Sequence, residues 1–321
     1  MNFCSFASHE PPSSSNTESE PELLIAVPNT LSSETVSPPS LPNTVPSIAE
    51  MSILTFQVDI FHLPTTKRIH TLPSPTSIHP SPTNPTQRGG MIMALSLFTH
   101  PTTAELTVIA GYESGHTIVS SLSPTTNTWK TKYTAHSHTQ PILSLSISLQ
   151  NNCYFTSSAD ANLAKHPIPA PVLVVDDDVE EIQRDDVEAA AGGELKVVKT
   201  GHSGQQNLKV RNDGKIFATA GWDGRVRVYA VKTMRELAVL KWHKEGCYAV
   251  AFADVDVLED KAIGRDEEDN SKIDREGQSK ELVVGRTSLL TVRQERIRKA
   301  EITHWLAVGS KDGKVSLWDV Y

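Results

Sequence analysis

Short runs of alternating apolar and polar residues, separated by turn signals, recur along this chain. The clearest example is residues 217–229, in which two such runs flank the pair Asp223-Gly224. Residues 305–319 repeat the arrangement around Asp312-Gly313. Period-two alternation predicts half-buried strands, and an Asp-Gly pair permits the positive φ that a tight turn needs. The pattern therefore predicts successive antiparallel hairpins.

A histidine precedes each hairpin, and an aromatic residue closes it. His202 and His243 are about 41 residues apart, which matches the roughly 40–45 residues of a WD40 repeat. The closing aromatics are Tyr229 and Trp318. A unit that runs from histidine to aromatic in this way is typical of a WD40 blade, a sheet of four antiparallel strands. The predicted fold is therefore an all-β WD40 β-propeller.

The same period predicts about five recognisable blades within one domain that spans residues 1–321. Three inserts interrupt this domain, and their composition does not favour packing into a core. The predicted blades are residues 1–75, 89–134, 135–200, 201–241 and 242–321. The predicted inserts are residues 28–57, rich in Ser and Pro, the acidic residues 167–194, and the charged residues 254–301.

Most WD40 propellers have seven blades, and this chain begins inside a blade and ends after a third strand. In a closed propeller the N-terminus usually supplies the fourth strand of the last blade, which removes exposed sheet edges. We therefore expect two N-terminal blades to be missing, through truncation or an incorrect gene model. A second hypothesis is that the insert 28–57 is derived from an intron.

Composition narrows the possible partners and compartments. The net charge of −8 disfavours direct binding to nucleic acid. Cys4, Cys153 and Cys247 have no paired spacing, so we expect reduced thiols in a cytosolic or nuclear protein. No apolar run approaches the roughly 20 residues of a membrane span, and no secretory signal is evident.

Four polar residues of the clearest repeat could be mistaken for a catalytic group. They are His202, Thr219, Asp223 and Tyr229. In a WD40 blade such residues commonly share one buried hydrogen-bond network, which is tolerated because each group satisfies another. In the last predicted blade the corresponding residues are His243, Asp312 and Trp318, while Val308 replaces the hydroxyl residue. We expect a smaller network there.

The sequence offers no catalytic, cofactor or metal site. His136 and His138 form a close pair without a third ligand, and Gly201-His202-Ser203-Gly204 lacks the Lys-Ser/Thr of a phosphate-binding loop. A Gly-Xaa-Ser-Xaa-Gly motif is absent, so we predict that the chain is not an enzyme. Trp222, beside a predicted turn, is a candidate anchor for a protein partner; its alternative role is packing against the adjacent blade.

Several segments resemble the ASTRA-associated protein 1 family of fungi, whose animal relatives are the guanine nucleotide-binding protein β-subunit-like protein 1 group. The resemblance is strongest over residues 201–227 and 237–244, and it includes residues 22–29, 59–64 and 161–166. It implies a seven-bladed scaffold subunit of the nuclear ASTRA complex. It also implies, as partners, a kinase-related protein, its cochaperones and RuvB-like AAA+ ATPases. The implied roles are chromatin remodelling and maturation of phosphatidylinositol-3-kinase-related kinases.

Three alternative functions remain open. A signalling adaptor like a G-protein β subunit would usually carry an N-terminal coiled coil, and no sustained apolar heptad precedes the blades. A reader of histone tails or peptides would need an acidic or aromatic cage at the channel mouth. A propeller enzyme would need a channel carboxylate that supports turnover, and no motif indicates one.

Overall fold

The computed structural model describes ten stretches of the chain. These are residues 6–11, 22–29, 57–73, 90–150, 152–169, 194–202, 204–254, 296–297, 299–300 and 303–320. Most of the three predicted inserts lies outside these ranges, as does Cys4. The proposed boundaries of the single domain therefore stay a prediction.

The described strands form five antiparallel sheets, and within each sheet neighbouring strands follow one another in the chain. The first sheet holds β1 (Ala7–His9), β2 (Leu23–Asn29), β3 (Gln57–Leu63) and β4 (Lys67–Leu72). The second holds β5 (Ile92–Thr99), β6 (Leu106–Tyr112), β7 (His116–Leu122) and β8 (Trp129–His136). The third holds β9 (Ile142–Ile147), β10 (Cys153–Ser158), β11 (Asn162–Pro167) and β12 (Lys196–Lys199). The fourth holds β13 (Gln205–Val210), β14 (Ile216–Gly221), β15 (Val226–Ala230) and β16 (Glu236–Leu240). The fifth holds β17 (Cys247–Phe252), β18 (Trp305–Ser310) and β19 (Val315–Asp319).

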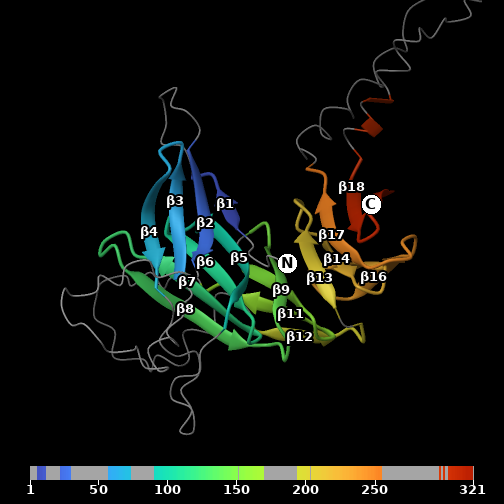
Figure 1. Ribbon diagram of the computed structural model, residues 1–321, viewed down its shortest axis with the longest axis horizontal. Coiled ribbons are helices and arrows are strands. Elements are labelled where there is room, and N and C mark those ends of the chain that lie inside the picture. Colours follow the sequence, from blue (N-terminus) through green and yellow to red (C-terminus); the bar gives the residue numbers. More distant parts are fainter. Residues whose placement is uncertain are drawn as a thin grey trace, which may run out of the picture.

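The sheets stand side by side along an arc. The first strand of each sheet contacts the first strand of the next, in the order β1, β5, β9, β13 and β17. Figure 1 shows the β1 sheet at one end of this arc and the β17 sheet at the other. Meandering sheets arranged radially are the architecture of propeller blades. The predicted all-β WD40 propeller class is therefore confirmed, and the total of seven blades stays a prediction.

Apolar clusters fill the spaces between adjacent sheets. One cluster joins the first two sheets and includes Ala26 and Ile60, and another joins the third and fourth and includes Phe155 and Phe217. Every residue of β10 and of β14 is buried, because these strands have a sheet on each side. Burial on both faces explains why β14 is composed of apolar and small residues without strict alternation.

The fifth sheet buries one face and exposes the other. Leu306 and Val308 pack toward the fourth sheet. The opposite face carries Ala307, Val315 and Leu317. The side chains of Val315 and Leu317 are mostly exposed. Phe252, Ala253, Ala300, Trp305, Ala307 and Leu317 line an apolar hollow beside it. Contiguous apolar surface of this kind is typical of a face that further polypeptide covers.

Two of the cysteines are free and buried. Cys153 lies on β10 and Cys247 begins β17. Burial raises the pKa of the Cys247 thiol to about 11. The neutral thiol therefore predominates at neutral pH, and it packs as a small apolar group in the core.

Candidate functional site

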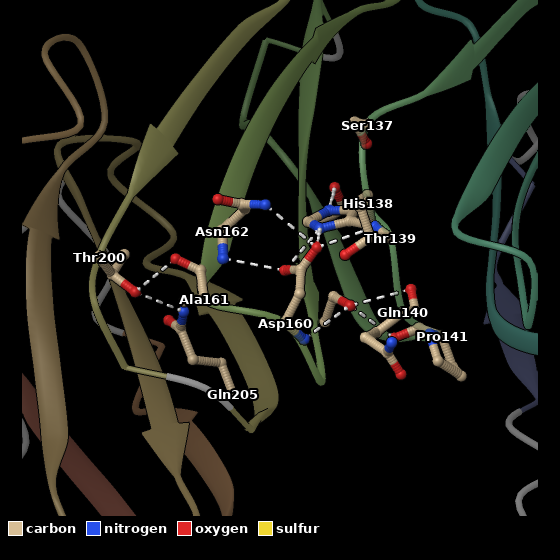
Figure 2. A network of polar contacts seen from close by, with 12 residues as sticks. Ser137, His138, Thr139, Gln140, Pro141, Asp160, Ala161, Asn162, Thr200 and Gln205 are labelled. Atoms are coloured by element: carbon tan, nitrogen blue, oxygen red, sulfur yellow. Dashed lines mark hydrogen bonds and ion pairs between the residues drawn. The ribbon is translucent and has the colours of Figure 1, made fainter.

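A buried chain of hydrogen bonds joins the loop before β9 to the turn between β10 and β11, as Figure 2 shows. His138 Nδ1 lies 3.1 Å from Asp160 Oδ1, and His138 Nε2 lies 2.8 Å from Thr156 Oγ1. Thr156 Oγ1 lies 3.1 Å from His166 Nε2, and His166 Nδ1 lies 3.3 Å from the hydroxyl of Tyr133. The chain therefore runs through three strands, one loop and one turn.

One arrangement of protons gives every contact in the chain a donor and an acceptor. A carboxylate only accepts, so His138 Nδ1–H donates to Asp160, and His138 Nε2 accepts from the hydroxyl of Thr156. The oxygen of Thr156 accepts from His166 Nε2–H, and His166 Nδ1 accepts from the hydroxyl of Tyr133. Burial lowers the pKa of His166 to about 3, so this ring is neutral at pH 7.

Asp160 also organises the turn in which it lies. The backbone amides of Asn162 and Thr139 donate to its carboxylate at 2.9 and 3.1 Å, and Asn162 Nδ2 donates at 3.1 Å. Burial alone would raise the pKa of Asp160, but these donors and His138 hold it below its ordinary value. The carboxylate therefore fixes the turn and the incoming loop together.

Sequence reasoning missed this network, although its spacing was available. Asp160 follows Thr156 by four residues and precedes His166 by six, which is the spacing of Thr219, Asp223 and Tyr229. His166 thus occupies the position of the closing aromatic, and its ring stacks on Tyr154 with the centroids 4.7 Å apart. Alanine follows Asp160, whereas glycine follows Asp223 and Asp312 in the two clearest repeats, so this blade lacks the Asp-Gly turn signal.

The fourth sheet places the four residues of the predicted network differently. Among the described residues, the ring of His202 has no hydrogen-bond partner, and its backbone contacts Thr200 and Gln205. Thr219 Oγ1 and Tyr229 Oη are buried, and neither forms a hydrogen bond that meets the usual limits of distance and angle. The two hydroxyls are nevertheless close enough for Thr219 to lower the pKa of Tyr229 slightly, against the larger effect of burial. Burial raises that pKa to about 12. The predicted network of His202, Thr219, Asp223 and Tyr229 is thus not connected here by hydrogen bonds.

Asp223 instead binds a buried arginine. Arg227 on β15 donates to Asp223 through Nη2 at 2.6 Å and through Nη1 at 3.2 Å. The side chain of Arg227 is 1% exposed and that of Asp223 is 34% exposed. Burial would raise the pKa of Asp223, but the hydrogen bonds and charge of Arg227 hold it below its ordinary value. Arg227 lies opposite Thr219 across the β14–β15 pair, so the carboxylate meets the guanidinium at this turn.

Replacing Asp223 with alanine is expected to lower the free energy of unfolding by about 2 kcal/mol. Arg227 would keep a buried charge, and its one remaining ion-pair partner among the described residues would be Glu236. Asp312→Ala is the matched control. Both carboxylates accept a hydrogen bond from the amide two residues later, but Asp312 binds the exposed Lys314. Chemical denaturation of both variants checks this, and a loss in Asp312→Ala as large as in Asp223→Ala would contradict it.

The last sheet holds a smaller polar chain than the third. His243 Nε2 lies 2.8 Å from Ser316 Oγ, and Trp318 Nε1 donates to the same oxygen at 2.9 Å. Asp312 lies outside this chain and forms an ion pair with Lys314 at 2.7 Å. Ser316, which the sequence analysis did not single out, therefore connects His243 to Trp318.

The neutral His166 makes stability fall in mild acid. Its folded pKa lies below that of an unfolded histidine, so between about pH 6.5 and pH 3 the unfolded chain binds a proton that the folded chain does not. This residue should lower the free energy of unfolding by about 2 kcal/mol between pH 7 and pH 5. Denaturation at several pH values should give a shallower slope for His166→Phe than for the unaltered chain. Equal slopes would contradict the prediction.

Trp222, the candidate partner contact, lies on the turn between β14 and β15. Its ring is 46% exposed, and Nε1 donates to Gln206 Oε1 at 2.8 Å. The ring also covers Gly204, where an added Cβ would lie 2.2 Å from the indole. Trp222 therefore packs at one edge and presents its remaining surface to solvent.

The described residues contain no group of three or more His, Cys, Asp or Glu side chains placed to hold a metal ion. His136, paired with His138 in the sequence, stacks on His116 instead, with the centroids 4.0 Å apart. Within the same ranges, no helix is long and apolar enough to cross a membrane.

Comparisons with known proteins agree with this architecture. The family model "WD domain, G-beta repeat" matches residues 193–230 and 303–319, which include β13, β14, β15, β18 and β19. ASTRA-associated protein 1 of Aspergillus niger is 41% identical over 345 residues, covering 100% of this chain and 69% of the relative. The chain belongs to the ASTRA-associated protein 1 family. The resemblance noted from the sequence is thereby confirmed.

Other members of the ASTRA-associated protein 1 family match the whole of this chain. The Verticillium alfalfae protein of that name is 43% identical over 321 residues, and the Pyricularia oryzae protein is 36% identical over 391 residues. The chain spans 65% of the length of the first and 73% of the second. It therefore corresponds to about two thirds of these family members.

Proposed function

We propose that this chain is a non-catalytic scaffold subunit of the ASTRA complex in the nucleus. The observation that carries the proposal is its 41% identity, along its whole length, to a protein named ASTRA-associated protein 1. Radially arranged sheets support a scaffold role, because their loops present several surfaces on a rigid frame. The proposed partners are the kinase-related protein, its cochaperones and the RuvB-like AAA+ ATPases.

The proposed process is chromatin remodelling together with the maturation of phosphatidylinositol-3-kinase-related kinases. A subunit that holds a kinase-related protein near AAA+ ATPases would contribute by positioning, so its own surface needs no reactive group. The buried networks support this role, since they use histidine, aspartate and threonine to fix loops. No direct contact with nucleic acid or membrane is proposed.

The test is purification of the tagged endogenous protein from nuclear extract, followed by mass spectrometry. We expect the kinase-related protein, its cochaperones and the RuvB-like ATPases to be recovered in similar amounts in repeated purifications. A different stable set of proteins, such as signalling components or histones alone, would reject ASTRA membership and favour an adaptor or a reader. Recovery of general chaperones alone would count against a working scaffold.

A further inference from the structure

Three large aromatic rings lie exposed around the junction of the fourth and fifth sheets. Trp222 lies on the β14–β15 turn, Trp242 on the loop between β16 and β17, and Tyr248 on β17. Their exposed fractions are 46%, 54% and 42%. Gly246 links two of them, since an added Cβ there would lie 3.0 Å from the Trp222 carbonyl oxygen and 3.3 Å from the Tyr248 ring. We call Trp222, Trp242, Tyr248 and their connecting loops the tryptophan face.

Backbone contacts hold the tryptophan face rigid. The amide of Lys311 donates to the Gly246 carbonyl at 2.9 Å, and Ser310 Oγ donates to the same oxygen at 3.2 Å. Gly224 has a φ of +73°, and an added Cβ would lie 2.9 Å from the carbonyl oxygens of His243 and Glu245. The loop of residues 242–246 is thus held between two turns. Aromatic rings on a fixed frame lose little entropy on binding, which favours their use as anchors.

The charges on these loops are unevenly compensated. Asp223 and Asp312 are bound by Arg227 and Lys314. Arg225, Lys244 and Lys311 are exposed and have no ion-pair partner among the described residues. Glu245 is the one other carboxylate on the same loops. This local excess of positive charge is notable on a chain whose net charge is −8, because it gives the tryptophan face a sign opposite to that of the whole protein.

We propose that the tryptophan face binds an acidic segment of a partner protein, with an apolar or aromatic residue of that segment packed against the exposed rings. Arg225, Lys244 and Lys311 would pair with its carboxylates, and Trp222 and Trp242 would supply the buried contact. This inference rests on the proposed scaffold function and names the chemistry of one partner. The few cations present, spread over separate loops, favour a peptide over a nucleic acid backbone.

Charge reversal on the face is the direct test. The endogenous protein carrying Lys244→Glu and Lys311→Glu is purified, and its companions are quantified against the unaltered protein. Recovery of the ASTRA partner that binds this face is expected to fall about tenfold. The matched control is Lys232→Glu with Arg235→Glu, on the exposed connection at the opposite end of β15, which should leave recovery unchanged. Unaltered melting temperatures in both variants show that the sheets remain folded.

A photo-crosslinking amino acid in place of Trp242 identifies the occupant. Mass spectrometry of the crosslinked peptide should find an acidic segment of an ASTRA subunit. A crosslink to a basic segment, to nucleic acid or to a second copy of this chain would overturn the inference. If the unaltered protein recovers its partners and the double charge reversal does too, the inference fails while the scaffold function stands. If the unaltered protein recovers no ASTRA subunit, the scaffold function fails.

Discussion

Replacing Asp160 with alanine is expected to lower the free energy of unfolding by about 3–5 kcal/mol. The substitution removes the acceptor for His138 and for the amides of Asn162 and Thr139 at once. These donors lie in a buried turn, so few waters can replace the carboxylate. His138 would also lose the contact that fixes its tautomer, which weakens its bond to Thr156. Chemical denaturation followed by circular dichroism measures the loss.

Asp160→Asn is the control for this prediction. The amide keeps one acceptor oxygen with almost the same shape, but its NH₂ group would face donors. The loss should therefore be intermediate between those of the unaltered chain and Asp160→Ala. A loss below about 1 kcal/mol in Asp160→Ala would contradict the prediction, because an unsatisfied buried donor alone costs that much.

The sequence pattern predicted the strands best where a turn signal and alternation coincide. The hairpin of β14 and β15 around Asp223-Gly224 and that of β18 and β19 around Asp312-Gly313 are both observed. Gly224 and Gly313 have φ of +73° and +78°, which is the backbone conformation that the pattern requires. Local chemistry determines these turns, so local sequence suffices to predict them.

The partners of the polar side chains could not be predicted in the same way. Asp223 has the expected position, but Arg227 on the next strand competes for it, and the depth at which Arg227 is buried depends on the adjacent sheet. His138, Thr156 and His166 form the connected network because the loop before β9 brings His138 over β10. Both outcomes depend on how sheets and loops pack, which alternation along one strand does not encode.

The buried network and the tryptophan face are both built from a turn between middle strands and a loop that enters a sheet. In the third sheet, His138 on the incoming loop binds Asp160 on the turn. At the junction of the fourth and fifth sheets, the β14–β15 turn of the fourth sheet carries Trp222, and the loop that enters the fifth sheet carries Trp242. Turns and entering loops thus form internal bonds within the third sheet and present aromatic rings between the fourth and fifth. Substitutions of the first kind should change stability, and those of the second kind should change binding.

Phe217→Ala is expected to lower the free energy of unfolding by about 4 kcal/mol. The ring is fully buried on β14 and lies between two others, with centroids 4.8 Å from Phe155 and 5.1 Å from Tyr229. Its removal leaves a cavity between the third and fourth sheets, and rigid strands on both sides cannot close it.

Two controls separate this cavity from a general loss of apolar surface. Phe217→Leu keeps most of the volume and should cost about 1–2 kcal/mol, whereas Leu237→Ala on β16 removes a largely exposed side chain and should change little. Denaturation of all three variants under one condition gives the comparison. Equal losses in Phe217→Ala and Phe217→Leu would show that the sheets collapse onto the site. The stacked rings would then fill space between the sheets without specifying how those sheets are spaced.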